Sequence, residues 1–164
     1  HEDPRRQRQM CIRDSANDRR YGGANDETGE RRRRGMSKRI GVVCGSFHKD
    51  EVERMLGYST EEAQSLGLTV GDVVWVPGSM EVPLALDRLL ATHDGAVCLG
   101  IIEKGETQHG LAMGQAVIKT ILELQLKHNK PIGLGIIGPG AEPHHIEPRL
   151  EPHARAAMGA CANP

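Results

Sequence analysis

Apolar and polar positions alternate in blocks along the chain and predict strands and helices in turn. Four short runs rich in Val, Ile and Leu predict strands: RIGVVCG (39–45), DVVWVPG (72–78), GAVCLGII (95–102) and PIGLGIIG (131–138). Amphipathic spacing and capping signals predict helices over residues 49–67, 79–93 and 107–127, and a last helix after GPGAEP. In the second helix we predict Ser79 as the N-cap, with Pro83 in the first turn, where a missing N–H costs little.

Strands that alternate with helices pair in parallel through right-handed crossovers. The run GAVCLGII is apolar at positions of both faces, so we expect this strand to lie in the centre of the sheet. The fold class predicted is a three-layer α/β/α sandwich with a four-stranded parallel sheet, which is flavodoxin-like. In such sheets ligands bind beyond the carboxyl ends of the strands, so the four strand-to-helix junctions are the candidate site.

Composition changes sharply near residue 35. Residues 1–35 hold ten arginines and seven acidic residues, whereas residues 36–164 carry a net charge of −4. The first segment has too few aliphatic residues to offset its ordering entropy, and it allows three interpretations: a basic arm for nucleic acid, a disordered tail, or an artefact. The string MCIRDS resembles a translated sequencing adapter. We therefore expect a disordered or artefactual extension over 1–35, no nucleic-acid partner, and a domain over 36–164 with Met36 as its natural start.

Cysteine usage and hydropathy exclude several classes of protein. Cys11, Cys44, Cys98 and Cys161 form no CxxC pair, which argues against a disulfide framework or a zinc knuckle. No stretch approaches the roughly 18 apolar residues that span a membrane. The N-terminus also lacks the apolar region of a secretory signal. We expect a cytoplasmic protein with no membrane partner.

The stretch EKGETQH (103–109) contains the largest group of candidate binding and catalytic residues. Backbone N–H groups at Gly105, Glu106 and Thr107 precede a helix, where the helix dipole favours a bound phosphate. His109 follows in the first turn and could donate or remove a proton near neutral pH. The alternative is an ordinary capped turn, with Thr107 as the cap and His109 as an exposed surface residue.

Two other junctions carry weaker signals. Phe47 is the only phenylalanine and follows the first strand, where its ring could stack on a flat heterocycle or plug the edge of the core. Gly78 and Ser79 could bind ligand hydroxyls or form a plain N-cap.

The C-terminal segment contains histidines, arginines and three Glu-Pro pairs. The spacing of His144, His145 and His153 fits no standard ligand set, so we expect no metal. The Glu-Pro pairs disfavour regular helix before about residue 151. Either Arg149 or Arg155 could clamp a phosphate, and the alternative is a surface charge.

Taken in order, these motifs resemble the 6,7-dimethyl-8-ribityllumazine synthase family. The matching stretches run from Arg39 to Gly159 and are SFH, VPGSMEVPLA, GIIEKGETQH, KPIGLGIIGPG and PRLEPHARAA. The pair VPGSMEVP and GETQH is specific, and GPG after the fourth strand is similar to archaeal-type members.

The resemblance implies an enzyme of riboflavin biosynthesis. Such an enzyme condenses 5-amino-6-(D-ribitylamino)uracil with 3,4-dihydroxy-2-butanone 4-phosphate to 6,7-dimethyl-8-ribityllumazine. This chemistry is acid/base catalysis plus anion stabilisation, so it implies no cofactor and no metal. The resemblance also implies a homo-oligomer, either a pentamer or a shell of pentamers, whose sites are shared between subunits.

The resemblance also assigns roles to residues at matching positions. His109 would be the acid/base, Gly105, Glu106 and Thr107 would hold the phosphate, and Arg149 would reach it from a neighbouring subunit. Phe47 would stack on the pyrimidinedione ring, and Leu134 would pack against that ring from the neighbour. The remaining expected substrate-binding residues are Ser79, Met80, Glu81, Ile102 and Glu103.

Two departures from the family pattern leave alternatives open. His48 stands where the family usually has Asn, and Leu134 stands where Phe is common. A related archaeal-type riboflavin synthase shares the fold, although the intact GETQH argues against it. A non-catalytic shell or ligand-holding homologue is a second alternative. A flavodoxin-like nucleotide-binding module is a third, but no Walker pattern supports it.

Overall fold

The computed structural model describes residues 35–163, which contain a sheet of four strands. All neighbouring strands pair in parallel, in the order β2-β1-β3-β4. The strands are β1 (Arg39–Gly45), β2 (Thr69–Val76), β3 (Gly95–Glu103) and β4 (Ile132–Ala141). The prediction for residues 1–35 falls almost entirely outside the described residues and stays a prediction.

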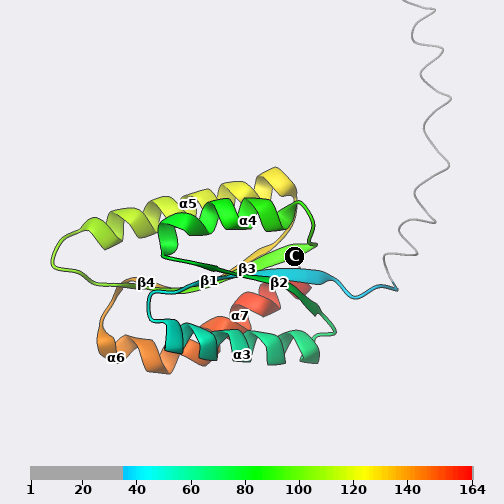
Figure 1. The fold of residues 1–164 in the computed structure, drawn as a ribbon, viewed down its shortest axis with the longest axis horizontal. Coiled ribbons are helices and arrows are strands. Elements are labelled where there is room, and N and C mark those ends of the chain that lie inside the picture. Colours follow the sequence, from blue (N-terminus) through cyan, green and yellow to red (C-terminus); the bar gives the residue numbers. More distant parts are fainter. Residues whose placement is uncertain (1–34, 164) are drawn as a thin grey trace, which may run out of the picture. The chain divides into compact units, whose positions relative to one another are not determined.

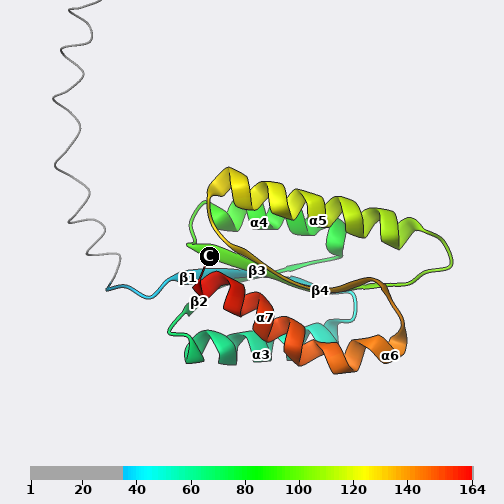
Figure 2. The same cartoon turned by 180° about the vertical axis from the view of Figure 1, so that it is seen from behind.

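Helices cover both faces of this sheet, as Figures 1 and 2 show from opposite sides. One face carries α4 (Val82–Leu90) and α5 (His109–His128). The other carries α3 (Lys49–Ser65), α6 (Pro143–Ile146) and α7 (Leu150–Ala162), with a short 3₁₀ helix, η2 (Glu147–Arg149), between the last two. A second 3₁₀ helix, η1 (Ser79–Glu81), precedes α4. The predicted three-layer sandwich is confirmed.

The core consists of two apolar layers, one on each face of the sheet. Successive side chains of a strand point to opposite faces, so Val42 packs towards α3 and α7 while Val43 packs towards α4 and α5. Strand β3 is buried from Gly95 to Ile102, as expected for a central strand. This rigid central strand carries the EKGETQH junction at its end.

Strand β2 begins at Thr69 rather than at residue 72 as predicted from the apolar run. The Thr69 N–H donates to the Lys38 carbonyl at 2.9 Å, and the strand pairs with β1 from Arg39 onwards. Gly71 is needed here because a Cβ atom would lie against the His93 ring. This contact joins residues far apart in sequence, so local periodicity could not predict it.

The predicted N-cap at Ser79 is wrong. The α-helix begins at Val82, after the 3₁₀ helix η1, and no hydrogen bond from the Ser79 hydroxyl caps it. Instead the Glu81 carboxylate reaches back and accepts the N–H of Gly78 at 3.0 Å. Pro83 does lie in the first turn of α4, as expected.

Prolines shape the segment after β4. Pro143 occupies the first position of the short helix α6, where its missing N–H costs no hydrogen bond. Regular helix then resumes at Leu150, with Pro152 in the first turn of α7. The Glu-Pro pairs therefore predicted the start of α7 within one residue, but not α6, because a proline also fits a helix start.

Between residues 35 and 163, no helix is both long enough and apolar enough to cross a bilayer.

Candidate active site at the carboxyl end of the sheet

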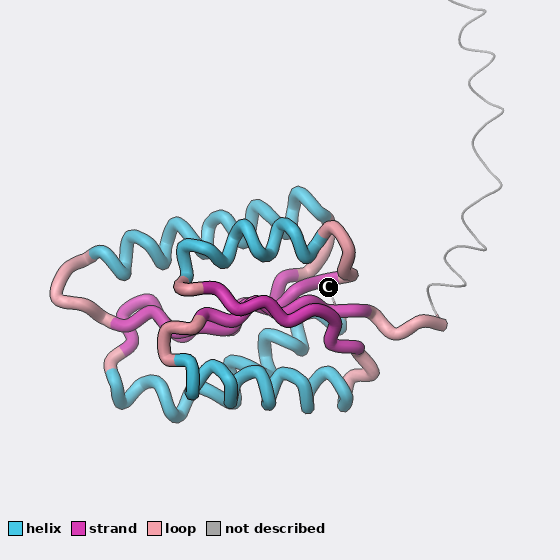
Figure 3. The backbone as a smooth tube through the Cα atoms, viewed as in Figure 1, coloured by secondary structure: helices cyan, strands magenta, loops and turns pink. Residues whose placement is uncertain are grey.

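The loops that follow β1, β2 and β3 meet at the carboxyl edge of the sheet, which lies at the left of Figures 1 and 3. They enclose a pocket of about 560 Å³. Most sequence-predicted site residues line it: Phe47, Ser79, Met80, Glu81, Ile102, Glu103, Gly105, Thr107 and His109. Segments far apart in sequence therefore form one site, as the parallel topology requires.

The Phe47 ring is presented to the pocket and not to the core. Its side chain is 53% exposed, which rules out the interpretation as a core plug. The loop beneath it is held because the N–H and hydroxyl of Ser46 both donate to the Val76 carbonyl, at 2.8 and 3.0 Å. The result is an aromatic platform on a fixed loop.

The second junction brings Ser79, Met80 and Glu81 to the same pocket. Met80 is 64% exposed and lines the pocket. The Glu81 carboxylate is oriented by its bond with Gly78 N–H. This wall therefore combines an apolar side chain with an oriented carboxylate.

The third junction presents backbone donors at the start of α5. Between residues 35 and 163, no hydrogen-bond partner is found for the N–H groups of Gly105, Glu106 and Thr107. The twenty-residue helix α5 directs the positive end of its dipole to the same place. Lys104 lines the pocket beside these groups, whereas the Glu106 side chain does not. This arrangement suits a phosphate.

Helix α5 begins at His109, two residues later than predicted, with Gln108 as its N-cap. The His109 N–H points to Thr107 Oγ1 across a long 3.4 Å contact, so the Thr107 hydroxyl proton is free to face an anion. The exposed His109 lines the pocket. An imidazole beside an anion site can exchange a proton with a bound ligand.

Arg149 and Leu134 do not line this pocket. Arg149 lines a smaller cavity of about 210 Å³ together with His145 and His153, and its guanidinium donates to the His145 carbonyl at 3.0 Å. Burial, followed by the Arg149 charge, lowers the pKa of His153 below its usual value. Leu134 is 40% exposed and pairs with Cys98, in the middle of the edge strand β4. Both lie apart from the pocket of their own chain.

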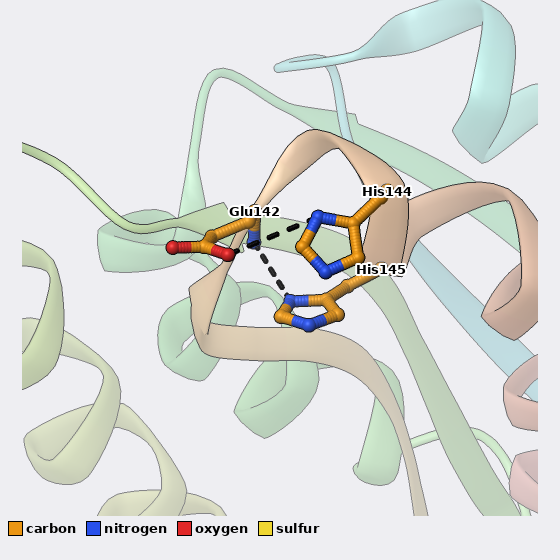
Figure 4. Close-up of side chains that lie close together, drawn as sticks. All are labelled: Glu142, His144 and His145. Carbon is orange, nitrogen blue, oxygen red and sulfur yellow. Dashed lines mark hydrogen bonds and ion pairs between the residues drawn. The ribbon is translucent and has the colours of Figure 1, made fainter.

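Glu142, His144 and His145 gather at the start of α6 (Figure 4). Their ligand-type atoms lie within 4.8 Å of one another, a proximity that the spacing of the histidines did not predict. However, His145 Nδ1 already accepts the backbone N–H of Glu142 at 3.0 Å, and Lys104 Nζ lies 3.4 Å from Glu142 Oε1. The contacts present make this cluster a helix cap that is linked to the loop after β3.

Sequence reasoning missed several pocket residues. Gly110 and Met113, on the first turns of α5, line the pocket, and Pro77 and Ile101 complete it. Met113 follows His109 at a spacing of four, which places both on one face of a helix, so this residue could have been found. Pro77 and Ile101 follow only from the tertiary arrangement.

Taken together, the parallel sheet, the aromatic platform and the histidine beside a helix N-terminus define a flavodoxin-like α/β enzyme with a candidate anion site. The chain matches the model of the 6,7-dimethyl-8-ribityllumazine synthase family over residues 37–163. It belongs to this family.

Curated archaeal relatives carry the same description. The 6,7-dimethyl-8-ribityllumazine synthase of Staphylothermus marinus is 39% identical over 126 residues, which cover 76% of this chain and 84% of the relative. The corresponding protein of Picrophilus torridus is 38% identical over 75% of this chain and 91% of its own length. The corresponding protein of Metallosphaera sedula is 37% identical over 74% of this chain and 82% of its own length. The archaeal-type resemblance of the sequence is thereby confirmed.

Proposed function

We propose that this pocket condenses 5-amino-6-(D-ribitylamino)uracil with 3,4-dihydroxy-2-butanone 4-phosphate, which is the lumazine synthase reaction. The amine of the uracil attacks the ketone and loses water to form an imine. Inorganic phosphate then leaves, and the ring closes with loss of a second water. The observation that carries the proposal is one pocket lined by Phe47, Gly105, Thr107 and His109.

In this proposal the pyrimidine lies on the Phe47 ring. An exposed aromatic face stacks well on a flat heterocycle. Ser79, Met80 and Glu81 line the adjacent wall, where a hydroxyl and a carboxylate suit the hydroxyls of a ribityl chain, and Ile102 and Glu103 form the floor. The two substrates would thus be held side by side, and such proximity carries much of the rate of a condensation.

The phosphate of the second substrate would bind the backbone N–H groups at residues 105–107 and the Thr107 hydroxyl. The unpaired donors and the dipole of α5 support this placement. His109 would then exchange protons with the leaving phosphate and with the carbon beside it. All of these roles are filled by the chain's own residues.

We further propose that the active form is a homo-oligomer, a pentamer or a shell of pentamers, whose sites are completed by a neighbouring subunit. Arg149 would reach the phosphate, and Leu134 the heterocycle, of the adjacent subunit. Both are exposed and lie outside the pocket of their own chain. Large exposed apolar side chains on α4 and α5, among them Leu84, Leu122 and Leu126, are consistent with burial in an assembly. The proposed location is cytoplasmic.

The reaction is tested by mixing the purified protein with both substrates and following the absorbance and fluorescence of the lumazine. Formation of lumazine without any added cofactor is the expected result. A protein that binds the uracil substrate but forms no lumazine would instead be a ligand-holding shell.

The sharing of the site is tested by subunit mixing. His109→Ala and Arg149→Ala variants should each be nearly inactive alone. Mixed oligomers, prepared by co-expression, should regain activity, because some sites then combine an intact His109 with an intact Arg149 from the neighbour. Failure to regain activity in verified mixed oligomers would place both residues in the same subunit's site.

A further inference from the structure

His48 and Glu103 contact each other at the edge of the pocket. His48 follows Phe47 in the loop after β1, and Glu103 is the last residue of β3 and lines the pocket. His48 Nε2 lies 2.6 Å from Glu103 Oε1. The backbone of Glu103 is fixed by its pairing with Ala141, whose carbonyl accepts the N–H of Lys104 at 2.8 Å. The strand end that carries Glu103 is therefore fixed, and the Glu103 carboxylate contacts the His48 ring.

The backbone of His48 adopts the left-handed conformation, with φ 57° and ψ 52°. Between residues 35 and 163, only one other non-glycine residue has positive φ, and this is Asn129, which ends α5 in the ordinary way. At His48 the conformation begins α3, and the His48 carbonyl accepts the N–H of Val52 at 3.0 Å. A strained backbone of this kind persists where the surroundings hold it, often at functional sites.

The His48 ring lies between two carboxylates and one aromatic ring. Its Nδ1 is 3.9 Å from Glu51 Oε2, and its centroid is 4.6 Å from that of Phe47, at an interplanar angle of 77°. Its Nε2 is buried, and the contact with Glu103 falls short of hydrogen-bond geometry. Among the described residues, no contact engages the second oxygen of Glu103, Oε2. One acceptor thus remains for a ligand.

We propose that His48 is a positioning residue that holds Glu103 so that its free oxygen accepts a hydrogen bond from an N–H group of the heterocycle. This inference rests on the proposed function. It assigns the recognition of the pyrimidine to the pair His48 and Glu103. The same imidazole packs edge-on against Phe47. The site thereby favours a heterocycle that presents an N–H donor at this edge.

The test measures KM separately for the two substrates. Glu103→Met keeps the length of the side chain but removes the acceptor, and it should raise KM for the uracil substrate about 10-fold or more, as expected for a lost charged hydrogen bond. KM for the butanone phosphate should stay within about twofold, because the phosphate donors are untouched. Glu103→Gln retains an amide oxygen and should lie between the wild type and Glu103→Met.

His48→Asn tests the positioning role, since Asn tolerates left-handed backbone. It should raise the same KM by a smaller factor, and the double variant His48→Asn/Glu103→Met should be no worse than Glu103→Met alone. Glu51→Gln is the matched control, because it removes the other carboxylate beside His48 but lies outside the pocket. Thermal melting of each variant verifies that it is folded.

An unchanged KM for the uracil substrate in Glu103→Met would overturn the proposal. It would also be overturned if the increase of this KM in the double variant equalled the product of the increases in the two single variants. Calorimetric binding of the uracil substrate separates this inference from the proposed reaction. If the wild type forms no lumazine yet Glu103→Met weakens binding, the pair selects the heterocycle and the reaction assignment fails. If lumazine forms and binding is unaffected in Glu103→Met, the inference fails alone.

Discussion

Phe47 and His109 line the same pocket, although β2, α4 and β3 lie between them in the chain. Parallel strands joined by right-handed crossovers bring the ends of β1 and β3 side by side. An aromatic ring and an imidazole thus face the same volume. This relationship connects the fold to the chemistry of a condensation between a heterocycle and a phosphoester.

Replacement of His109 tests the acid/base role. His109→Ala should lower kcat by about 10²–10⁴-fold, since proton transfer by a positioned side chain contributes a factor of that size. KM should change less, because the N–H groups at residues 105–107 still bind the phosphate. His144→Ala is the control, since His144 is exposed on α6 and lies outside the pocket. Full activity of His109→Ala in the lumazine assay would remove His109 from the mechanism.

The packing of α7 on β4 depends on Gly133. A Cβ atom at this position would overlap the carbonyl of Ala157 on α7. Gly133→Ala should therefore lower the free energy of unfolding by about 1–3 kcal/mol or more, as overpacking does. Gly159→Ala, on the same helix but in open space, should instead raise it by about 0.5–1 kcal/mol. Urea unfolding measures the free energy of unfolding of both variants. Equal changes in the two variants would show that the contact between Gly133 and Ala157 does not limit the packing of α7.

His93 joins the start of β2 to the end of α4. The residue is 2% exposed, its Nε2 accepts the N–H of Asp72 at 3.1 Å, and its Nδ1–H donates to the Leu89 carbonyl at 2.9 Å. His93→Leu should lower the free energy of unfolding by about 2–4 kcal/mol, since each buried group left unpaired costs about 1–3 kcal/mol.

The control for His93 is His128→Leu, which removes a contact with Asp87 at 2.8 Å that is only partly buried. It should change the unfolding free energy by less than about 1 kcal/mol. A comparable loss in the two variants would show that the buried bonds of His93 do not stabilise the fold.

The lowered pKa of His153 leads to a specific prediction for how the free energy of unfolding depends on pH. Its pKa in the folded state is lowered from 6.5, first by burial and then by the charge of Arg149. The neutral form is therefore favoured by folding, and its stabilisation is complete above pH 6.5 and is lost as the pH falls through the folded-state pKa. Urea unfolding at several pH values should show a steeper loss for the wild type than for His153→Gln. If the free energy of unfolding falls with decreasing pH equally in the wild type and in His153→Gln, the pH dependence does not come from His153.

The order of strands and helices was predictable because apolar runs and amphipathic spacing are local properties. The meeting of the junctions after β1, β2 and β3 followed from the topology, and EKGETQH identified His109. The junction after β4 was also expected at this site, but it lines the separate cavity that contains Arg149. The actual cap of the 79–81 turn could not be predicted, because the hydrogen bond from the Gly78 N–H to the Glu81 carboxylate depends on the loop conformation.

Other features depend on contacts between distant residues. The early start of β2 requires Gly71 against His93, and the His48–Glu103 contact requires two loops from different strands. The gathering of Glu142 with His144 and His145 likewise depends on how α6 turns after β4. None of these leaves a periodic signal in the sequence, which is why sequence reasoning placed the elements well and the side-chain pairs poorly.

The central claim is that a single pocket holds the heterocycle on Phe47 and the phosphate at residues 105–107, beside His109. The most direct test is a crystal structure of the assembled protein with the uracil substrate and inorganic phosphate bound. We predict the pyrimidine ring stacked on Phe47, and the phosphate oxygens accepting hydrogen bonds from the N–H groups of Gly105 and Thr107. A ring bound away from Phe47, with the phosphate at another helix end, would contradict the account.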